Sequence, residues 1–154
     1  MKIAVLHGVN LNMFGKRDKK VYGTATLEDI NESLKKQADD LNLSLVLYQT
    51  NNEAEFVEFI HHLADSDIEG VLINAGAWTH YNIALLDALA RLSIPIVEVH
   101  MSNIYSREDF RKHSVISPIA KGVISGFGVD SYLLGLLALA NIIKNSSASE
   151  PLMC

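Results

Sequence analysis

Hydrophobic residues along the chain gather in short runs that are rich in Val, Ile and Leu and are bounded by Gly, Asn or Pro. Runs of roughly four to eight such residues are typical of strands that are buried on both faces in a parallel sheet. We therefore expect five buried strands. They are predicted at residues 2–7, 43–49, 70–74, 95–101 and 122–126.

Between these runs, apolar residues recur at the three- and four-residue spacing of amphipathic helices. Thr26, with Asp29 three residues later, predicts a capping box at the start of the first helix. A fourth pattern, residues 132–143, is apolar nearly all round, so we expect a helix covered by the sheet or by another subunit. The first three helices are predicted from Leu27, Ile30, Leu34, Ala38 and Leu41, from Phe56, Phe59, Ile60 and Leu63, and from Leu85, Ala88, Leu89 and Leu92.

Strands that alternate with helices predict βαβ units, whose right-handed crossovers produce a parallel sheet with helices on both faces. The expected fold is α/β and flavodoxin-like, with a doubly wound five-stranded parallel sheet. The length of 154 residues and the 49% share of hydrophobic residues favour one domain. We place this domain at residues 1–145 and expect a disordered polar tail at 146–154.

Composition excludes several classes of partner. The formal charge of -5 argues against nucleic acid, which normally needs a basic face. The one cysteine, Cys154, is the last residue, so no internal disulfide can form. The stretch 132–143 is shorter than the roughly 20 residues of a membrane span, and the N-terminal apolar core is too short for a signal peptide. We therefore expect a cytoplasmic protein without a membrane partner.

Polar side chains stand at the ends of the predicted strands, which is where open α/β sheets bind ligands. Asn10, Asn74, His80 and His100 should therefore converge on one edge of the sheet. In the segment EVHMSN, Glu98 and His100 lie two residues apart and share a face of the strand. The carboxylate can accept the ring N–H, fix the tautomer and raise the basicity of the imidazole. The alternative is a structural histidine whose hydrogen bonds are satisfied.

Residues 8–23 form a long loop after the first strand, and loops of this length are often lids or binding loops. The loop carries Arg17 and Tyr22 among several lysines. The alternative is a solvated basic loop whose tyrosine merely packs. The loop lacks the Gly-Lys-Ser/Thr ending of a phosphate-binding P-loop, so nucleotide hydrolysis is not expected.

The segment after His100 is rich in arginine. Ser106 and Asp109 predict a second capping box, for a short helix that bears Arg107 and Arg111. An arginine here could grip a carboxylate or hydroxyls, or both arginines could pair with the acidic residues between them. No metal site is predicted, because the histidines show neither the H-E-x-x-H pattern nor a Cys/His spacing.

Five ordered segments of the chain read GVNLNMFGKRDKKVYG, QTNNEA, NAGAWTH, EVHMSNIYSREDFR and GVISGFG. Together they resemble the motifs of the type II 3-dehydroquinate dehydratases, and the similarity covers residues 2–143. This family consists of hydro-lyases of the shikimate and quinate pathways that use no cofactor. The resemblance implies conversion of 3-dehydroquinate to 3-dehydroshikimate and water by anti elimination through an enolate. It also implies a homododecamer, built as a tetramer of trimers.

By this resemblance, Tyr22 is the base that removes a proton from C2 of the substrate, and Arg17 on the lid stabilises its phenolate. His100 is the acid that protonates the departing C1 hydroxyl, and Glu98 orients it. Asn10 holds a water molecule that stabilises the enolate oxygen. The residues implied in substrate binding are Asn74, His80, Met101, Ser102 and Arg111, with Asp87 reaching in from a neighbouring subunit.

Some positions depart from the family pattern. Val9, Lys19 and Ala75 replace prolines, which should loosen the lid and the loop after the third strand more than alter the chemistry. Fold does not fix function, so a binding module that holds a flavin, nucleotide or carboxylate without chemistry is the second hypothesis. The elimination is common to aromatic biosynthesis and quinate breakdown, and both roles stay open.

Overall fold

The computed structural model describes residues 1–16 and 18–148. Its core is one sheet of five parallel strands in the order β2-β1-β3-β4-β5. This is the flavodoxin-like order, so the predicted α/β fold class is confirmed. Each strand begins and ends within one residue of its predicted range. The strands are β1 (Lys2–His7), β2 (Ser44–Gln49), β3 (Gly70–Asn74), β4 (Ile96–His100) and β5 (Gly122–Ser125).

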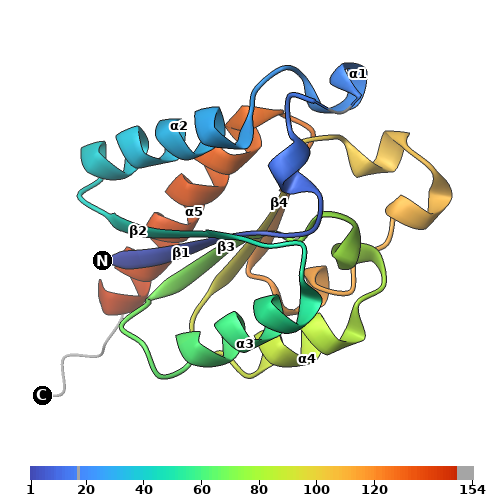
Figure 1. Cartoon of the computed structure of the whole chain (residues 1–154). Coiled ribbons are helices and arrows are strands. Elements are labelled where there is room, and N and C mark those ends of the chain that lie inside the picture. Colours follow the sequence, from blue (N-terminus) through green and yellow to red (C-terminus); the bar gives the residue numbers. More distant parts are fainter. Residues whose placement is uncertain (17, 149–154) are drawn as a thin grey trace, which may run out of the picture.

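Helices cover both faces of the sheet, as Figure 1 shows. On one face α2 (Leu27–Asp40) packs beside α5 (Val129–Ala148), and on the other α3 (Glu53–Leu63) packs beside α4 (Ile83–Ala90). The predicted capping box is present at the start of α2. Asp29 N donates to Thr26 Oγ1 over 3.1 Å, and Thr26 N donates to Asp29 Oδ2 over 3.0 Å. Two apolar cores result, one on each side of the sheet.

Burial differs between the central and the outer strands. The central strands β1, β3 and β4 are buried along almost their whole length, as predicted. The prediction of full burial is wrong for β2 and β5, which are half-buried or exposed. Each of these strands lies at an edge of the sheet and has a neighbouring strand on one side alone. Their Val, Ile and Leu residues report the strand but not its position in the sheet.

The last helix is covered on one side within this chain. Tyr132, Leu136 and Leu139 are buried against the sheet, whereas Leu134 is 45% and Leu137 is 40% exposed. The sheet therefore covers one face of the helix and leaves the opposite face open. Helix α5 continues to Ala148, beyond the domain boundary expected at residue 145. The rest of the expected tail, residues 149–154, lies outside the described residues. No helix of the described part of the chain is long and apolar enough to cross a membrane.

Two long connections border the carboxyl edge of the sheet. The first follows β1 and contains the turn η1 (Leu11–Met13) and the short helix α1 (Lys19–Tyr22). The second follows β4 and contains three 3-10 turns, η3 (Ile104–Ser106), η4 (Asp109–Arg111) and η5 (Ser117–Ile119). Both connections lie on the right of Figure 1.

The capping box predicted for the second connection is wrong. Ser106 ends η3, and its hydroxyl donates back to the carbonyl of Asn103 over 2.9 Å. The following turn begins after Glu108, whose side chain makes no capping hydrogen bond. A serine can bond its own upstream backbone as readily as it caps a helix, which is why the sequence pattern misled.

Candidate active site

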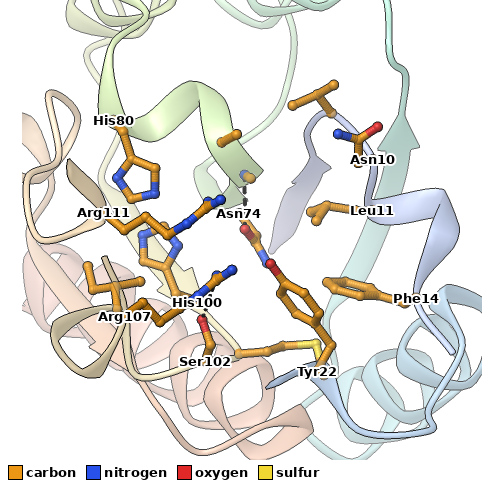
Figure 2. A pocket seen from close by; sticks show the side chains of 15 residues that line it. Asn10, Leu11, Phe14, Tyr22, Asn74, His80, His100, Ser102, Arg107 and Arg111 are labelled. Atoms are coloured by element: carbon orange, nitrogen blue, oxygen red, sulfur yellow. Dashed lines mark hydrogen bonds between the residues drawn. The ribbon is translucent and has the colours of Figure 1, made fainter. Parts of the chain in front are cut away.

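A pocket lies at the carboxyl edge of the sheet, between the two long connections (Figure 2). The four polar residues that were predicted to converge on this edge all line it, which confirms that expectation. Asn74 ends β3 and His100 ends β4, while Asn10 and His80 lie in the segments that follow β1 and β3. Tyr22, Ser102, Arg107 and Arg111 complete the polar part of the lining, and Met101 lines it beside Ser102.

Glu98 is a fully buried carboxylate that accepts four hydrogen bonds. His100 Nε2 lies 2.7 Å from Glu98 Oε1, and the hydroxyls of Thr79 and Ser114 donate to that same oxygen over 2.5 and 2.7 Å. Ser117 Oγ donates to Oε2 over 2.5 Å. Burial by itself would raise the pKa of Glu98, but the imidazole of His100 and the hydroxyls lower it to about 2. The carboxylate is therefore ionised at neutral pH.

The Glu98 contact also decides which nitrogen of His100 can act. Nε2 is engaged by the carboxylate, so Nδ1 is the nitrogen that can exchange a proton with a molecule in the pocket. The two residues share one face of β4, as predicted, and Val97 and Val99 enter the core on the opposite face. The predicted pairing of carboxylate and imidazole is therefore present.

His80 lies beside His100, with the ring centroids 6.4 Å apart. His80 Nδ1 donates to the carbonyl of His113 over 2.8 Å, so Nε2 is the ring nitrogen that faces away from His113. Burial lowers the pKa of His80, and the neighbouring His100 and Arg111 act in the same direction, although the bond to His113 and the charge of Glu98 oppose them. A neutral His80 suits hydrogen bonding to a ligand.

Tyr22 enters the pocket from α1 and packs against Phe14, with ring centroids 5.8 Å apart (Figure 2). The guanidinium carbon of Arg107 lies 5.2 Å from the centroid of the Tyr22 ring, and its Nη1 donates to Ser102 Oγ over 3.4 Å. Arg17, which was predicted to act on Tyr22, lies outside the described residues. No feature of the sequence linked Arg107 to this tyrosine, since the two are far apart along the chain.

The alternative in which both arginines pair with nearby acidic residues holds for one of them. Arg111 Nε donates to Glu108 Oε2 over 2.8 Å while Arg111 also lines the pocket. Arg107 instead contacts the tyrosine and serine just described. The guanidinium of Arg107 thus lies in the wall of the pocket. The guanidinium of Arg111 also lies in the wall, and it is bonded to the exposed Glu108.

The remaining predicted residues occupy different places. Asn10 has a left-handed backbone conformation with φ of 66°, and its N–H donates to Asn51 Oδ1 over 2.8 Å. Asn51, in the segment QTNNEA, was given no role from the sequence. Asn74 is buried, and its amide bonds Tyr132 and Gly76. Asp87 lies exposed on α4 and is not part of the pocket wall in this chain.

The described residues contain no group of three or more His, Cys, Asp or Glu side chains that could hold a metal ion. What the pocket offers is a phenol, two imidazoles, two guanidiniums and an ionised carboxylate behind one imidazole. The fold and the pocket thus define a class of protein: a flavodoxin-like α/β protein equipped for proton transfer on an anionic ligand.

Comparisons with known proteins define the family. A family model described as "Dehydroquinase class II" matches residues 1–140, and the chain therefore belongs to the class II dehydroquinases, which are lyases. A 3-dehydroquinate dehydratase of Syntrophotalea carbinolica is 56% identical over 143 residues, which cover 93% of this chain and 97% of that protein. One of Leptothrix cholodnii is 55% identical over 96% of this chain and 99% of its own length.

Solved structures agree with this assignment. The type II dehydroquinase from Propionibacterium acnes superposes with a TM-score of 0.87 at 44% identity, and the match covers 91% of this chain and 96% of that chain. The one from Butyrivibrio crossotus gives a TM-score of 0.88 at 38% identity and covers 90% and 97%. The family suggested by the sequence motifs is confirmed, and the hypothesis of a binding module without chemistry is wrong.

Proposed function

We propose that the pocket removes water from 3-dehydroquinate to give 3-dehydroshikimate, with Tyr22 as the base and His100 as the acid. The proton at C2 moves to the phenolate of Tyr22, and the electron pair of the broken C–H bond passes into an enolate at the neighbouring carbonyl. The enolate then re-forms the carbonyl and a C1–C2 double bond as the C1 hydroxyl leaves. His100 gives that hydroxyl a proton, so it departs as water.

The observation that carries this proposal is the pairing of His100 with the buried, ionised Glu98, in a pocket that also holds Tyr22. A carboxylate 2.7 Å from Nε2 stabilises the protonated imidazole and fixes the ring, so that Nδ1 can deliver a proton. Glu98 thereby acts through His100 and does not itself transfer the proton.

The base also needs electrostatic help, because an ordinary phenol ionises only near pH 10. One positive charge about 4 Å from a phenolate is worth up to about 4 kcal/mol at an effective dielectric constant of about 20. Arg17 on the lid is proposed to supply this charge, and Arg107, whose guanidinium carbon lies 5.2 Å from the centroid of the Tyr22 ring, adds a second positive charge nearby.

The other residues are proposed to hold the substrate and the intermediate. Asn10 positions a water molecule at the enolate oxygen. The substrate is bound by Asn74, His80, Arg111, the Met101–Ser102 backbone and the Ser102 hydroxyl, all of which belong to the pocket wall. Asp87, exposed on α4, reaches the pocket of a neighbouring subunit in a homododecamer. That assembly stays a prediction from the family resemblance, and the cytoplasmic location stays a prediction from the sequence.

The test is turnover of 3-dehydroquinate by the purified protein without added metal or cofactor, followed by the ultraviolet absorbance of the conjugated product. Tyr22→Phe should abolish turnover and leave product binding measurable by calorimetry. Tyr48→Phe is the matched control, because Tyr48 stacks on Phe59 outside the pocket. Undiminished turnover in Tyr22→Phe would remove Tyr22 from the role of base.

A further inference from the structure

Four polar side chains form a hydrogen-bonded line that ends at the pocket. His7 ends β1 and is the register partner of Asn74 on β3, so both point to the face covered by α2 and α5. His7 Nε2 lies 2.9 Å from Asn31 Oδ1 on α2, and His7 Nδ1 lies 3.1 Å from the hydroxyl of Tyr132 on α5. Asn74 Nδ2 donates to that same hydroxyl over 2.9 Å.

Three of the four side chains in the line are deeply buried. His7 and Tyr132 are fully buried and Asn74 is 3% exposed. Burying a polar group lowers stability unless all of its hydrogen bonds are made. Apolar side chains in place of His7 and Tyr132 would avoid that requirement. The proposed function uses Asn74 alone and leaves His7 and Tyr132 without a role.

A single backbone group sets the direction of every bond in the line. The N–H of Gly76 donates to Asn74 Oδ1 over 3.1 Å, and a backbone N–H can only donate. The amide oxygen of Asn74 must therefore face Gly76, and its NH2 must face Tyr132. The phenol oxygen accepts from Asn74, so the phenol proton goes to His7 Nδ1. This leaves Nε2 as the protonated nitrogen of His7.

His7 must be neutral for this arrangement, because a proton on Nδ1 would face the proton of the phenol. The environment agrees with that requirement. Burial lowers the pKa of His7 to about 4, more than the bond to Asn31 raises it. The titratable group in contact with His7 is Tyr132, whose pKa is raised by its own burial, so the pair stays uncharged.

We propose that His7 and Tyr132 are positioning residues, which hold the amide of Asn74 in one orientation so that its second N–H and second oxygen lone pair serve the substrate. The inference rests on the proposed function of the pocket. If the Asn74 amide were flipped, its NH2 group would face the N–H of Gly76. Its oxygen would then face the hydroxyl of Tyr132, which would no longer accept a hydrogen bond from Asn74. The N–H of Gly76 opposes that state, and the Tyr132 hydroxyl, held by His7, adds to the preference by accepting the amide N–H of Asn74.

A double-mutant cycle tests the proposal. Tyr132→Phe should lower kcat/KM by roughly tenfold, about the effect of one buried hydrogen bond, with the larger part in KM. In an Asn74→Ala background the same substitution should change kcat/KM by less than about twofold, because there is no amide left to orient. Equal losses in the two backgrounds would show a merely structural role and overturn the proposal.

A pair of variants of equal size tests His7. Asn and Leu have nearly the same shape, but Asn retains an acceptor close to the position of Nδ1. His7→Leu should match the loss of Tyr132→Phe, and His7→Asn should restore kcat/KM to within about threefold of the parent protein. Tyr48→Phe, with a ring that stacks on Phe59, should leave kcat and KM unchanged. Failure of His7→Asn to recover any activity in a folded protein would count against the proposal.

A measurement on the unsubstituted protein covers the case in which these variants do not fold. In protein labelled with 15N-histidine, the His7 resonances should report a protonated Nε2 and an unprotonated Nδ1 at neutral pH. The reverse tautomer would overturn the deduced direction. The proposed function fails separately, if the parent protein shows no turnover of 3-dehydroquinate at all.

Discussion

His7 and His100 make an instructive pair, because both are buried and both end a strand of the same sheet. They face opposite sides of it. His100 contacts an ionised carboxylate, whereas His7 contacts an amide oxygen and a phenol. The carboxylate can accept the ring N–H of His100 and orient the ring, whereas burial lowers the pKa of His7. The partners, and not the residue type or its place at a strand end, decide whether such a histidine can carry a proton.

The largest effect should come from removing the charge next to His100. Glu98→Gln keeps the shape but cannot stabilise an imidazolium, and its NH2 group would face hydroxyl donors. We expect kcat to fall on the order of 100-fold or more. Steady-state kinetics across pH measures this, with Glu58→Gln on the exposed side of α3 as the control. A kcat close to that of the parent protein would show that activity does not need the charge next to His100. The contrast between His7 and His100 would then have no functional meaning.

Next in size is the effect of acid on the free energy of unfolding. The pKa of His7 is about 4 in the folded protein and 6.5 ordinarily, so the unfolded chain binds more protons between these values. The stability associated with His7 is complete above pH 6.5 and is lost as the pH falls toward 4, by about 3 kcal/mol in total.

Urea unfolding at pH 6.5 and at pH 4 measures this loss, and His7→Asn should be nearly free of it. Glu98 acts in a lower window. Its stabilisation is present above pH 4.5 and is lost as the pH falls toward 2. A pH dependence in His7→Asn equal to that of the parent protein would show that folding does not lower the pKa of His7.

The smallest effect should come from one hydroxyl. Ser117→Ala removes the donor to Glu98 Oε2, so the pKa of the carboxyl group moves back toward its ordinary value. We expect unfolding at neutral pH to become easier by about 1 to 2 kcal/mol, since a hydrogen bond to a charged group is lost. Ser44→Ala, at the exposed start of β2, is the control. Equal stability of both variants would mean that the remaining three donors suffice.

Much of the fold could be predicted because local patterns carry it. Short apolar runs bounded by turn residues gave the strands, and Thr26 with Asp29 gave the start of α2. Ser106 and Asp109 carried the same pattern and failed, because the serine bonds its own upstream backbone. The burial of the edge strands was also misjudged, since residue type does not report the order of strands.

The site was predicted where its residues follow strands, and missed where partners are distant in sequence. His100 and Glu98 are two residues apart and were paired correctly. His7 and Tyr132 are 125 residues apart, and Tyr132 looked like one more apolar position of the last helix. Arg107 over Tyr22 was missed for the same reason. Contacts of this kind exist only once the sheet has brought its strand ends together.

Glu98 has one consequence outside chemistry. Its oxygens join β4 to two loops. Thr79 lies in the turn after β3, and Ser114 and Ser117 lie in the connection after β4. Hydrogen bonds within the protein thus hold these loops against the sheet. The conformational entropy of these two loops is lost when the protein folds and not when a ligand binds. Less of the interaction energy of a ligand is therefore spent on ordering the protein.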